Sequence, residues 1–392
     1  MKIVFIITDY GGFNNFLGEL ARKLVLNKNE VHVICDKEKV INFEDKFPYL
    51  SLGIHIHHVN FLRSLNLNVL SWLKTSARIK KIISEIEPDI VNLHFTTSIF
   101  LSLLSGRIKF PTIGVFHGLG YPVLTSPLKK YIFKKAEFFC FKRLDHIGLI
   151  NNFDYDLVKK FFPEKAFKFK SFGVGCDLNK FNINNFSLGD KNALKEKLNI
   201  QPADFVLMYT GRFVHFKGFD LVIKAFKYIE EKGLIKNIKL ILAGGKDSAH
   251  STGLNHKEEY YLQNAKNIIN IGFTERVDKY LSISDLFVFP SSKEGVPVGI
   301  MEAVAMGVPV ITINSRGCSD VIKHNYNGKL LDARSDFKAI AMAVVELHSN
   351  QQELELFSKN ALAQRTDFDR DLFIKESIEL FKHFTRLSPA KK

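Results

Sequence analysis

The stretch DLFVFPSSKEGVPVGIMEAVAMGVPVITI, residues 285–313, decides the fold class of this chain. It begins with the apolar run DLFVFPS and ends with a second one, PVITI, and a glycine-containing turn and an apolar segment lie between them. Pro297 suits the first turn of a helix and Gly307 suits its C-terminal cap, so we expect a helix from about Pro297 to Met306. A strand, a helix and a second strand in this order form a parallel βαβ unit.

The same alternation extends outward in both directions. Further strands are predicted at residues 2–8, 30–36, 88–95, 111–118, 204–212, 237–245 and 267–273. The pattern restarts after the polar segment 182–203, which we interpret as a linker. We therefore expect an α/β protein with two Rossmann-like domains, an N-terminal one at 1–183 and a C-terminal one at 184–370. A last helix is expected within 371–392.

Composition supports an ordinary globular protein with more than one core. The chain has 392 residues, of which 46% are hydrophobic and 24% are charged. It contains no apolar run of membrane-spanning length, and its N-terminus reads as a strand rather than a signal peptide. The cysteines form no CxxC pair, so we expect neither a disulfide framework nor a zinc site, and a reducing cytosol. They are Cys35, Cys140, Cys176 and Cys318.

The net charge of +14 predicts an anionic partner. Nucleic acid is not expected, because no nucleic-acid-binding module is recognisable. Segment 126–144, SPLKKYIFKKAEFFCFKRL, interleaves lysines with aromatic residues and suits an anionic membrane surface. The alternative interpretation is a core helix with solvated lysines.

Two glycine-containing loops are candidate ligand sites. In TGRFVHFKGFD, residues 210–220, a strand ends at Gly211, and Arg212 and Lys217 follow at the edge of the sheet where ligands bind. A guanidinium and an ammonium there suit a diphosphate, although two solvated surface cations would look the same. After the first strand, YGGFNNFLGEL lacks the GxGxxG spacing, so Gly11 and Gly12 are assigned only to close backbone approach to a ligand or to the facing domain.

Two carboxylates flank the start of the predicted helix 297–306. Glu294 lies in the loop before it and Glu302 in its second turn, where the helix N-terminus attracts a phosphate. Carboxylates would repel that phosphate and are better suited to accept hydrogen bonds from sugar hydroxyls. A nucleotide sugar satisfies both requirements. The alternatives are a glycosidase pair, which would need no phosphate clamp, and a purely structural glutamate.

The motif Glu294…Glu302 within EGVPVGIMEAVAMGVPVI, preceded by TGRFVHFKG, resembles family 4 of the retaining glycosyltransferases, which have the GT-B fold. The resemblance spans nearly the whole chain and is strongest over residues 205–330. It implies two Rossmann-like domains whose parallel sheets face a central cleft. It also implies that the C-terminal domain holds the nucleotide sugar and that no metal ion or other cofactor is needed.

The resemblance also implies roles for individual residues. Arg212 and Lys217 would bind the diphosphate, Glu294 the donor sugar and Glu302 the ribose. His117 in VFHGLG would reach the reacting sugar, and His94 is a lower-ranked candidate. Residues expected to line the donor site are Gly211, Gly244, Gly272, Phe273, Gly295, Val296, Pro297, Val298 and Gly299; those expected at the acceptor side are Gly11, Gly12, His117 and Gly118. The catalytic set is Glu294, His117, Lys217 and Arg212.

The sequence departs from the family pattern at three places, one of which is the first-domain pattern GHxV, present here as Asn29-Glu30-Val31. Phe216 stands where the family often has a glutamate, and Asp320 stands where a glutamate is usual, which puts the role of Asp320 in doubt.

The resulting functional expectation is metal-independent transfer of a hexose-type sugar with retention, from a UDP-sugar in preference to a GDP-sugar. The acceptor is expected to be a lipid-linked or other glycan in the biosynthesis of O-antigen, lipopolysaccharide, capsule or exopolysaccharide. Such an enzyme would be cytoplasmic and peripheral on the inner face of the cell membrane. A nucleotide-sugar epimerase or a phosphorylase on the same two-domain fold remains an alternative.

Overall fold

The structure is a computed structural model, and it describes residues 1–36, 52–61 and 69–387. Two compact units divide the chain. The first comprises Met1–Val174 together with Asp371–Lys392, and the second comprises Gly175–Arg370. The predicted boundary at 183/184 and the whole predicted linker 182–203 therefore lie inside the second unit. The second unit begins earlier because the backbone of Cys176 already pairs with the segment 368–370 of that unit.

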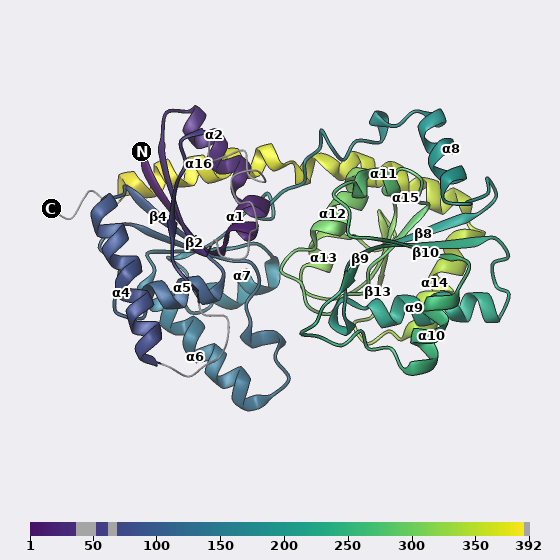
Figure 1. The fold of residues 1–392 in the computed structure, drawn as a ribbon, viewed down its shortest axis with the longest axis horizontal. Coiled ribbons are helices and arrows are strands. Elements are labelled where there is room, and N and C mark those ends of the chain that lie inside the picture. Colours follow the sequence, from purple (N-terminus) through teal and green to yellow (C-terminus); the bar gives the residue numbers. More distant parts are fainter. Residues whose placement is uncertain (37–51, 62–68, 388–392) are drawn as a thin grey trace. The chain divides into compact units, whose positions relative to one another are not determined.

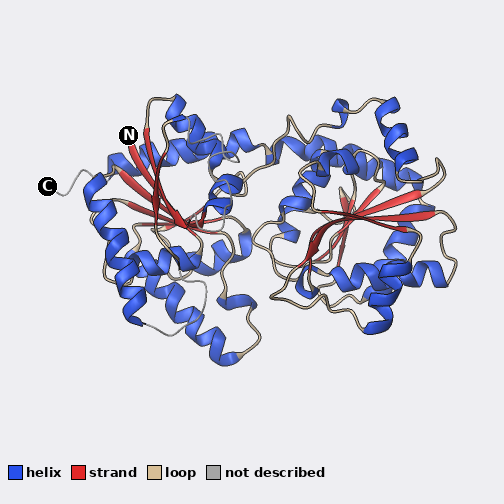
Figure 2. Cartoon of the chain, in the orientation of Figure 1, coloured by secondary structure: helices blue, strands red, loops and turns tan. Residues whose placement is uncertain are grey.

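The first unit contains a seven-stranded parallel sheet with the order β3-β2-β1-β4-β5-β6-β7. Its central strands are apolar on both faces, as expected when helices cover both sides (Figure 2). The strands are β1 (Lys2–Asp9), β2 (Glu30–Asp36), β3 (His55–His58), β4 (Ile90–His94), β5 (Thr112–Phe116), β6 (His146–Leu149) and β7 (Ala166–Lys168).

Helices pack on both faces of this sheet (Figure 1). They are α1 (Tyr10–Phe16), α2 (Gly18–Leu26), α4 (Val69–Ile86), α5 (Thr96–Leu103), α6 (Pro127–Arg143), α7 (Asn152–Lys159) and α16 (Arg370–Leu387), with a short 3-10 turn η2 (Tyr121–Val123). Helix α16 is joined to the unit by Glu376, whose carboxylate accepts hydrogen bonds from the Lys170 backbone N–H (2.7 Å) and the Ser171 hydroxyl (2.6 Å). Phe384 of the same helix stacks on His146 with ring centroids 3.6 Å apart.

The second unit contains a six-stranded parallel sheet with the order β10-β9-β8-β11-β12-β13. The chain builds outward from β8 in one direction to β10 and then in the other direction to β13. The gap between β8 and β11 is therefore the topological switch point, where ligands bind in open α/β sheets. The strands are β8 (Phe205–Phe213), β9 (Ile238–Lys246), β10 (Ile268–Gly272), β11 (Leu286–Val288), β12 (Val310–Ile313) and β13 (Gly328–Leu331).

Helices of the second unit also cover both faces of its sheet (Figure 2). They are α8 (Leu188–Lys197), α9 (Phe219–Glu231), α10 (His256–Asn264), α11 (Val277–Leu281), α12 (Val298–Ala305), α13 (Cys318–Val321), α14 (Phe337–Ser349) and α15 (Gln351–Gln364), with 3-10 turns η3 (Ile183–Asn185), η4 (His215–Lys217) and η5 (Arg365–Phe368). The βαβ unit predicted from residues 285–313 is present as β11-α12-β12.

Sequence patterns did not predict four strands, namely β3, β6, β7 and β13. Each has only three or four residues, and β3 (HIHH) consists mostly of histidines. Such segments become strands because they form backbone hydrogen bonds with a neighbouring strand. Local sequence propensity does not encode this tertiary pairing. Gly11 and Gly12, which we assigned to close backbone approach, lie in a helix that follows β1 directly. Both residues lie in the first turn of α1, where the Asp9 carboxylate caps the helix by accepting from the Gly12 N–H at 2.8 Å.

All four cysteines are free and buried, two in each unit. Among the helices of the described residues, none is long and apolar enough to cross a membrane.

Candidate active site

Two loops meet at the switch point of the second unit. One follows β8 and carries Arg212 and Lys217, and the other follows β11 and carries Glu294. Because β8 and β11 are adjacent and parallel, their C-terminal ends open on the same edge of the sheet. The Ser292 backbone N–H donates to the Phe216 carbonyl at 3.0 Å and ties the two loops together.

This tie places a cation beside a carboxylate. The Lys217 Nζ donates to the Glu294 Oε1 at 2.5 Å, and the Ser291 hydroxyl donates to the same oxygen at 2.7 Å. Glu294 is 8% exposed, so its charge is held largely out of water by these two donors. Its second oxygen, Oε2, has no hydrogen-bond partner among the residues that the structure describes, which leaves an acceptor for a ligand hydroxyl. Sequence reasoning predicted the Lys217 and Glu294 roles separately and missed Ser291.

Gly218 is required for this close approach. It has a φ of 73°, which favours glycine, and a Cβ there would lie 2.3 Å from the Pro290 carbonyl oxygen. A side chain at this position would push the Lys217 loop away from the loop that carries Glu294.

Arg212 lies at the end of β8, where its guanidinium forms an ion pair with Asp247. The pairing lowers the pKa of the Asp247 carboxyl, together with a hydrogen bond from the Ala249 N–H that has the larger effect. Half of the Arg212 side chain stays exposed, and a guanidinium has five N–H donors, so most of its donors remain available. Asp247 follows β9 and was not among the predicted site residues.

The predicted glycines of the donor site gather at neighbouring strand ends. Gly211 and Gly244 are register partners at the ends of β8 and β9, and a Cβ on Gly244 would lie 1.9 Å from the Gly211 carbonyl oxygen. Gly272 ends β10, next to β9. Phe273, which follows it, is 86% exposed. Because these residues are glycines, no side chains cover the backbone at these strand ends, and the exposed Phe273 ring lies next to them.

The segment Gly295–Gly299 leads into α12, which begins after the N-cap residue Pro297. Its path is fixed from the side by Arg316, whose Nε donates to the Glu294 carbonyl at 2.7 Å. The first-turn N–H groups of α12 lack helical partners, as at every helix N-terminus, and favour an anion. Asp320, whose role was in doubt, accepts a hydrogen bond from the Gly317 N–H at 3.3 Å and thus caps α13.

Glu302 lies in the second turn of α12, as predicted, and its side chain is half-buried. Burial raises the pKa of Glu302 to about 7, although nearby Lys180 and Arg370 oppose this shift. No hydrogen bond reaches its carboxylate from the residues that the structure describes. A half-buried carboxyl without a protein partner is an acceptor that a ligand hydroxyl can satisfy.

In the first unit, His94 and His117 lie side by side at the ends of β4 and β5. The Asn92 Oδ1 lies 2.6 Å from the His94 Nε2, and the His94 Nδ1 lies 2.9 Å from the His117 Nε2. The Asn92 amide nitrogen faces the Ile113 carbonyl, at 3.4 Å, so its oxygen faces His94. Burial holds the pKa of His94 well below its usual value and lowers the pKa of His117 to about 3. Both rings are therefore neutral at physiological pH.

Neutral rings fix the proton positions along this chain. The Asn92 oxygen can only accept, so the His94 Nε2 carries the proton and the His94 Nδ1 is an acceptor. His117 must then donate from Nε2, which leaves its Nδ1 as an acceptor. This Nδ1 is buried and has no hydrogen-bond partner among the residues that the structure describes. The His117 ring also stacks on Phe95, whose φ of 67° is unusual for a residue other than glycine.

The backbone of the loop that follows His117 is bound by the side chain of Glu137 of α6. This fully buried carboxylate accepts from the Gly120 N–H (2.7 Å), the Tyr121 N–H (3.3 Å) and the Thr96 hydroxyl (3.1 Å). Sequence reasoning missed Glu137 because a single carboxylate in a basic helix looks solvated. Of the predicted acceptor-side residues, Gly118 lies in this loop and has a φ of 114°, whereas Gly11 and Gly12 lie in α1 after β1.

Comparison with known proteins identifies the chain. The model of the glycosyl transferases group 1 matches residues 190–364, and the model of glycosyltransferase family 4 matches residues 10–167. The chain belongs to glycosyltransferase family 4. The site described above in the second unit thus lies in the part of this glycosyltransferase that matches the group 1 model.

Two relatives and one solved structure illustrate the similarity. A UDP-Gal:α-D-GlcNAc-diphosphoundecaprenol α-1,3-galactosyltransferase from Escherichia coli is 26% identical over 79% of this glycosyltransferase and 81% of the relative. The capsular polysaccharide biosynthesis glycosyltransferase CapM from Staphylococcus aureus is 27% identical over 67% of each chain. Anabaena HepE, solved with UDP and with UDP-glucose, has the same GT-B fold, with a TM-score of 0.78, 17% identity and coverage of 98% of this chain and 100% of HepE.

Proposed function

We propose that this glycosyltransferase moves a hexose-type sugar, with retention of anomeric configuration, from a UDP-sugar to a lipid-linked glycan during cell-surface polysaccharide biosynthesis. The relatives named above support this substrate class, because one uses UDP-Gal and a diphosphoundecaprenol-linked acceptor and another builds capsule. The proposed enzyme works without a metal ion or another cofactor in the transfer step, at the inner face of the cell membrane.

The observation that carries the proposal is the meeting of Lys217 and Glu294 at the switch point. The two residues are 77 positions apart in sequence, yet their side chains are in direct contact. An ammonium keeps two N–H donors for a diphosphate while it orients the carboxylate, and the carboxylate keeps Oε2 for a sugar hydroxyl. Arg212 adds a guanidinium that can bind two phosphate oxygens at once. The cations suit the diphosphate and the carboxylate suits the sugar. Together they suit a nucleotide sugar better than a free diphosphate or a free sugar.

The reaction that we propose is a front-face displacement. The bond between the anomeric carbon and the β-phosphate oxygen breaks, and the acceptor hydroxyl oxygen bonds to the anomeric carbon from the same face. The hydroxyl proton passes to the departing β-phosphate oxygen. Lys217, Arg212 and the first turn of α12 stabilise the negative charge that develops on the diphosphate, which is the role that a metal ion fills in other enzymes. His117 Nδ1 accepts a hydrogen bond from a hydroxyl of the reacting sugar.

Removal of either member of the Lys217–Glu294 pair is expected to lower turnover strongly. We expect Lys217→Ala and Glu294→Ala to reduce kcat by roughly 100- to 1000-fold, the usual cost of one preorganised charge-stabilising group. Release of nucleoside diphosphate from a panel of UDP- and GDP-sugars measures this and identifies the donor. Thermal unfolding checks that each variant is folded.

Lys232→Ala is the matched control, because Lys232 is an exposed cap residue at the far end of α9. It should behave as wild type. Wild-type turnover in Lys217→Ala and Glu294→Ala would remove the assignment of the donor site.

The reaction products separate the proposed transfer from its alternatives. A transferase forms a new glycoside with the configuration of the donor, which NMR of the product reports through the anomeric coupling. An epimerase would convert the donor sugar without an acceptor, and a phosphorylase would need inorganic phosphate. Turnover that persists after exhaustive chelation supports the metal-independent step.

The proposed membrane contact rests on helix α6. Residues 127–135 are exposed all around the helix, whereas Glu137, Cys140 and Phe141 of its second half are buried. The exposed half carries large apolar side chains, with Leu128 at 69% and Tyr131 at 60% exposure. Four lysines alternate with them, namely Lys129, Lys130, Lys134 and Lys135. Exposed apolar groups beside several cations suit an anionic bilayer surface.

Reversal of these charges is expected to abolish vesicle binding. The wild-type protein should float with vesicles that contain phosphatidylglycerol at low salt, and the Lys129→Glu/Lys130→Glu variant should not, because each cation contributes about 1 kcal/mol near such a surface. Lys338→Glu/Lys359→Glu, a change of the same charge on exposed residues of the second unit, is the control. Absence of wild-type flotation, or equal loss in the control, would contradict the membrane contact.

A further inference from the structure

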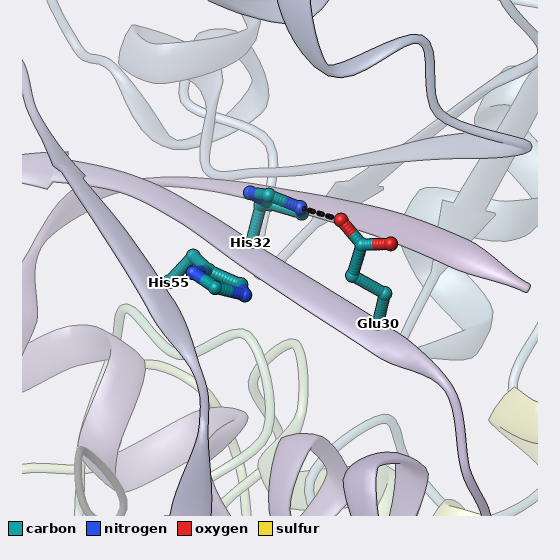
Figure 3. A group of neighbouring side chains, drawn as sticks. All are labelled: Glu30, His32 and His55. Atoms are coloured by element: carbon teal, nitrogen blue, oxygen red, sulfur yellow. Dashed lines mark hydrogen bonds and ion pairs between the residues drawn. The ribbon is translucent and has the colours of Figure 1, made fainter.

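A cluster of imidazoles and one carboxylate lies on strands β2 and β3, at one edge of the first sheet. Glu30 and His32 belong to β2, and His55 belongs to β3. His32 and His55 are direct register partners, so their side chains leave the same face of the sheet. Figure 3 shows the Glu30 carboxylate and the two rings gathered on that face. One ligand atom from each of the three residues can be chosen so that all lie within 4.8 Å of one another.

We propose that Glu30, His32 and His55 bind a divalent transition-metal ion, zinc first of all, and that this ion joins the edge strand β3 to β2. Two imidazoles and one carboxylate form a ligand set that zinc uses, with the fourth position left to water. Imidazole nitrogen also favours zinc over magnesium or calcium, which prefer oxygen ligands.

The hydrogen bonds of His32 support this assignment because they supply an orienting partner. The His32 Nε2 lies 2.8 Å from the Glu30 Oε1, and the His32 Nδ1 lies 3.0 Å from the His57 Nε2. Metal-bound histidines generally donate their second N–H to such a neighbour, which fixes the ring. His57 occupies that position here, since it lies two residues after His55 on the same face of β3.

Metal binding requires only proton shifts within this pair. In the metal-free state the His32 Nε2–H donates to Glu30, and the His57 Nε2–H donates to the His32 Nδ1. When the His32 Nε2 binds the ion, its proton moves to Nδ1 and donates to the His57 Nε2, while the His57 proton moves to its own Nδ1. Both rings stay neutral, and no net proton is released.

The geometry also shows what must move. Zinc ligands at 2.0–2.2 Å from the ion lie roughly 3.3 Å apart, and the three ligand atoms already lie within 4.8 Å of one another, so side-chain rotations suffice to close the site. His55 and Glu30 are exposed and can rotate, whereas His32 is buried and fixed. The Lys2 ammonium, 3.7 Å from the Glu30 Oε1, competes for the carboxylate. It also donates to the Ile86 carbonyl at 2.8 Å, so it can remain bound there after the carboxylate turns to the ion.

The test is zinc titration of the full-length protein without an affinity tag, by calorimetry and by competition with a chromophoric chelator. We expect one high-affinity zinc ion per chain. Replacement of zinc by cobalt should give the visible absorption of a tetrahedral site. The substitutions Glu30→Gln and His55→Asn each remove an exposed ligand and should not disturb folding. Each is expected to weaken zinc binding by more than about tenfold.

Two further variants make the site assignment specific. Lys2→Gln removes the competing cation and should tighten zinc binding. His58→Asn, one residue beyond His57 and on the other face of β3, should leave it unchanged. The proposal is overturned if the wild-type protein binds no zinc, or if Glu30→Gln and His55→Asn bind it as tightly as the wild type. It is also overturned if only His58→Asn loses binding. Thermal unfolding with zinc adds a readout independent of sugar transfer, since a bound ion should raise the Tm of the wild type and of His58→Asn more than that of Glu30→Gln or His55→Asn.

Discussion

The buried histidine pair illustrates how single residues are set by their neighbours. His117 can present an unprotonated Nδ1 only because the His94 Nδ1 accepts from the His117 Nε2–H, and the His94 Nδ1 is free to accept only because the His94 Nε2–H donates to Asn92. None of these three residues alone predicts that outcome. Asn92 and His94 are therefore positioning residues for the group that we propose touches the sugar.

This pair also predicts a pH dependence of stability. The pKa of His117 is lowered from 6.5 to about 3 by burial, so between these values the unfolded chain binds a proton that the native protein does not. The free energy of unfolding should therefore fall as the pH decreases from 6.5, by up to about 1.4 kcal/mol per pH unit for one such group. Urea unfolding of wild type and of His117→Gln at pH 7 and pH 5 measures the difference.

In His117→Gln this loss on acidification should be smaller, because the buried imidazole is gone. His383→Gln, which removes an exposed imidazole of α16, should keep the wild-type slope. If the free energy of unfolding falls equally with pH in wild type and His117→Gln, the native protein protonates His117 as readily as the unfolded chain does. That result would contradict the lowered pKa of His117.

At the scale of elements, α6 combines two opposite environments along one helix. Its first half is exposed, and its second half buries Glu137 beneath the loop that follows His117. Burial raises the pKa of Glu137 to about 7, although the three donors that it accepts from oppose this effect. The carboxyl thus holds the loop in place at a cost in desolvation.

Glu137→Ala should be strongly destabilising. It leaves two backbone N–H groups and one hydroxyl without an acceptor, and each buried orphan costs about 1–3 kcal/mol, so we expect a loss of roughly 3 kcal/mol or more. Glu137→Gln keeps one acceptor oxygen and should lose less. Urea unfolding measures both changes, with the exposed Glu164→Ala as a control that should stay within about 0.5 kcal/mol. A loss for Glu137→Ala no larger than that of the control would contradict this role.

The elements were predictable where several signals agreed. In β11-α12-β12, apolar runs, a proline and a glycine all pointed to one βαβ unit. In β3, the sequence HIHH has no apolar alternation and became a strand only through pairing with β2. The proximity of Lys217 and Glu294 was foreseeable, because both loops follow parallel strands and open on the same edge of the sheet. The partners Ser291, Asp247 and Asn92 were not, because a hydroxyl, a surface carboxylate and an amide carry no distinctive spacing.

At the scale of the whole molecule, the chain leaves the first unit at Val174 and returns to it at Asp371. Helix α16 completes the core of that first unit, since Phe381 contacts Phe5 with ring centroids 6.0 Å apart and Phe384 stacks on His146. The most N-terminal strand and the last helix are therefore parts of one folding unit, although nearly the whole sequence separates them.

A truncation after Arg370 is expected to destabilise the first unit selectively. It removes the packing of Phe381 and Phe384 and the Glu376 carboxylate, while the second unit keeps every residue that it contains. Hydrogen exchange read by mass spectrometry should show lost protection in β1 and β6 and unchanged protection in β8 and β9. Lys382→Ala, an exposed position on the same helix, is the control. Equal loss in both units would show that they do not fold separately.

The buried thiols provide built-in reporters for such experiments. Cys35 and Cys140 lie in the first unit and Cys176 and Cys318 in the second, each with at most 1% of its surface exposed. Burial raises the pKa of Cys140, Cys176 and Cys318, which withholds the reactive thiolate in the native protein. An alkylating reagent can therefore label each pair only when its own unit opens. Peptide mapping of the label over time would yield two separate opening rates from one unmodified polypeptide.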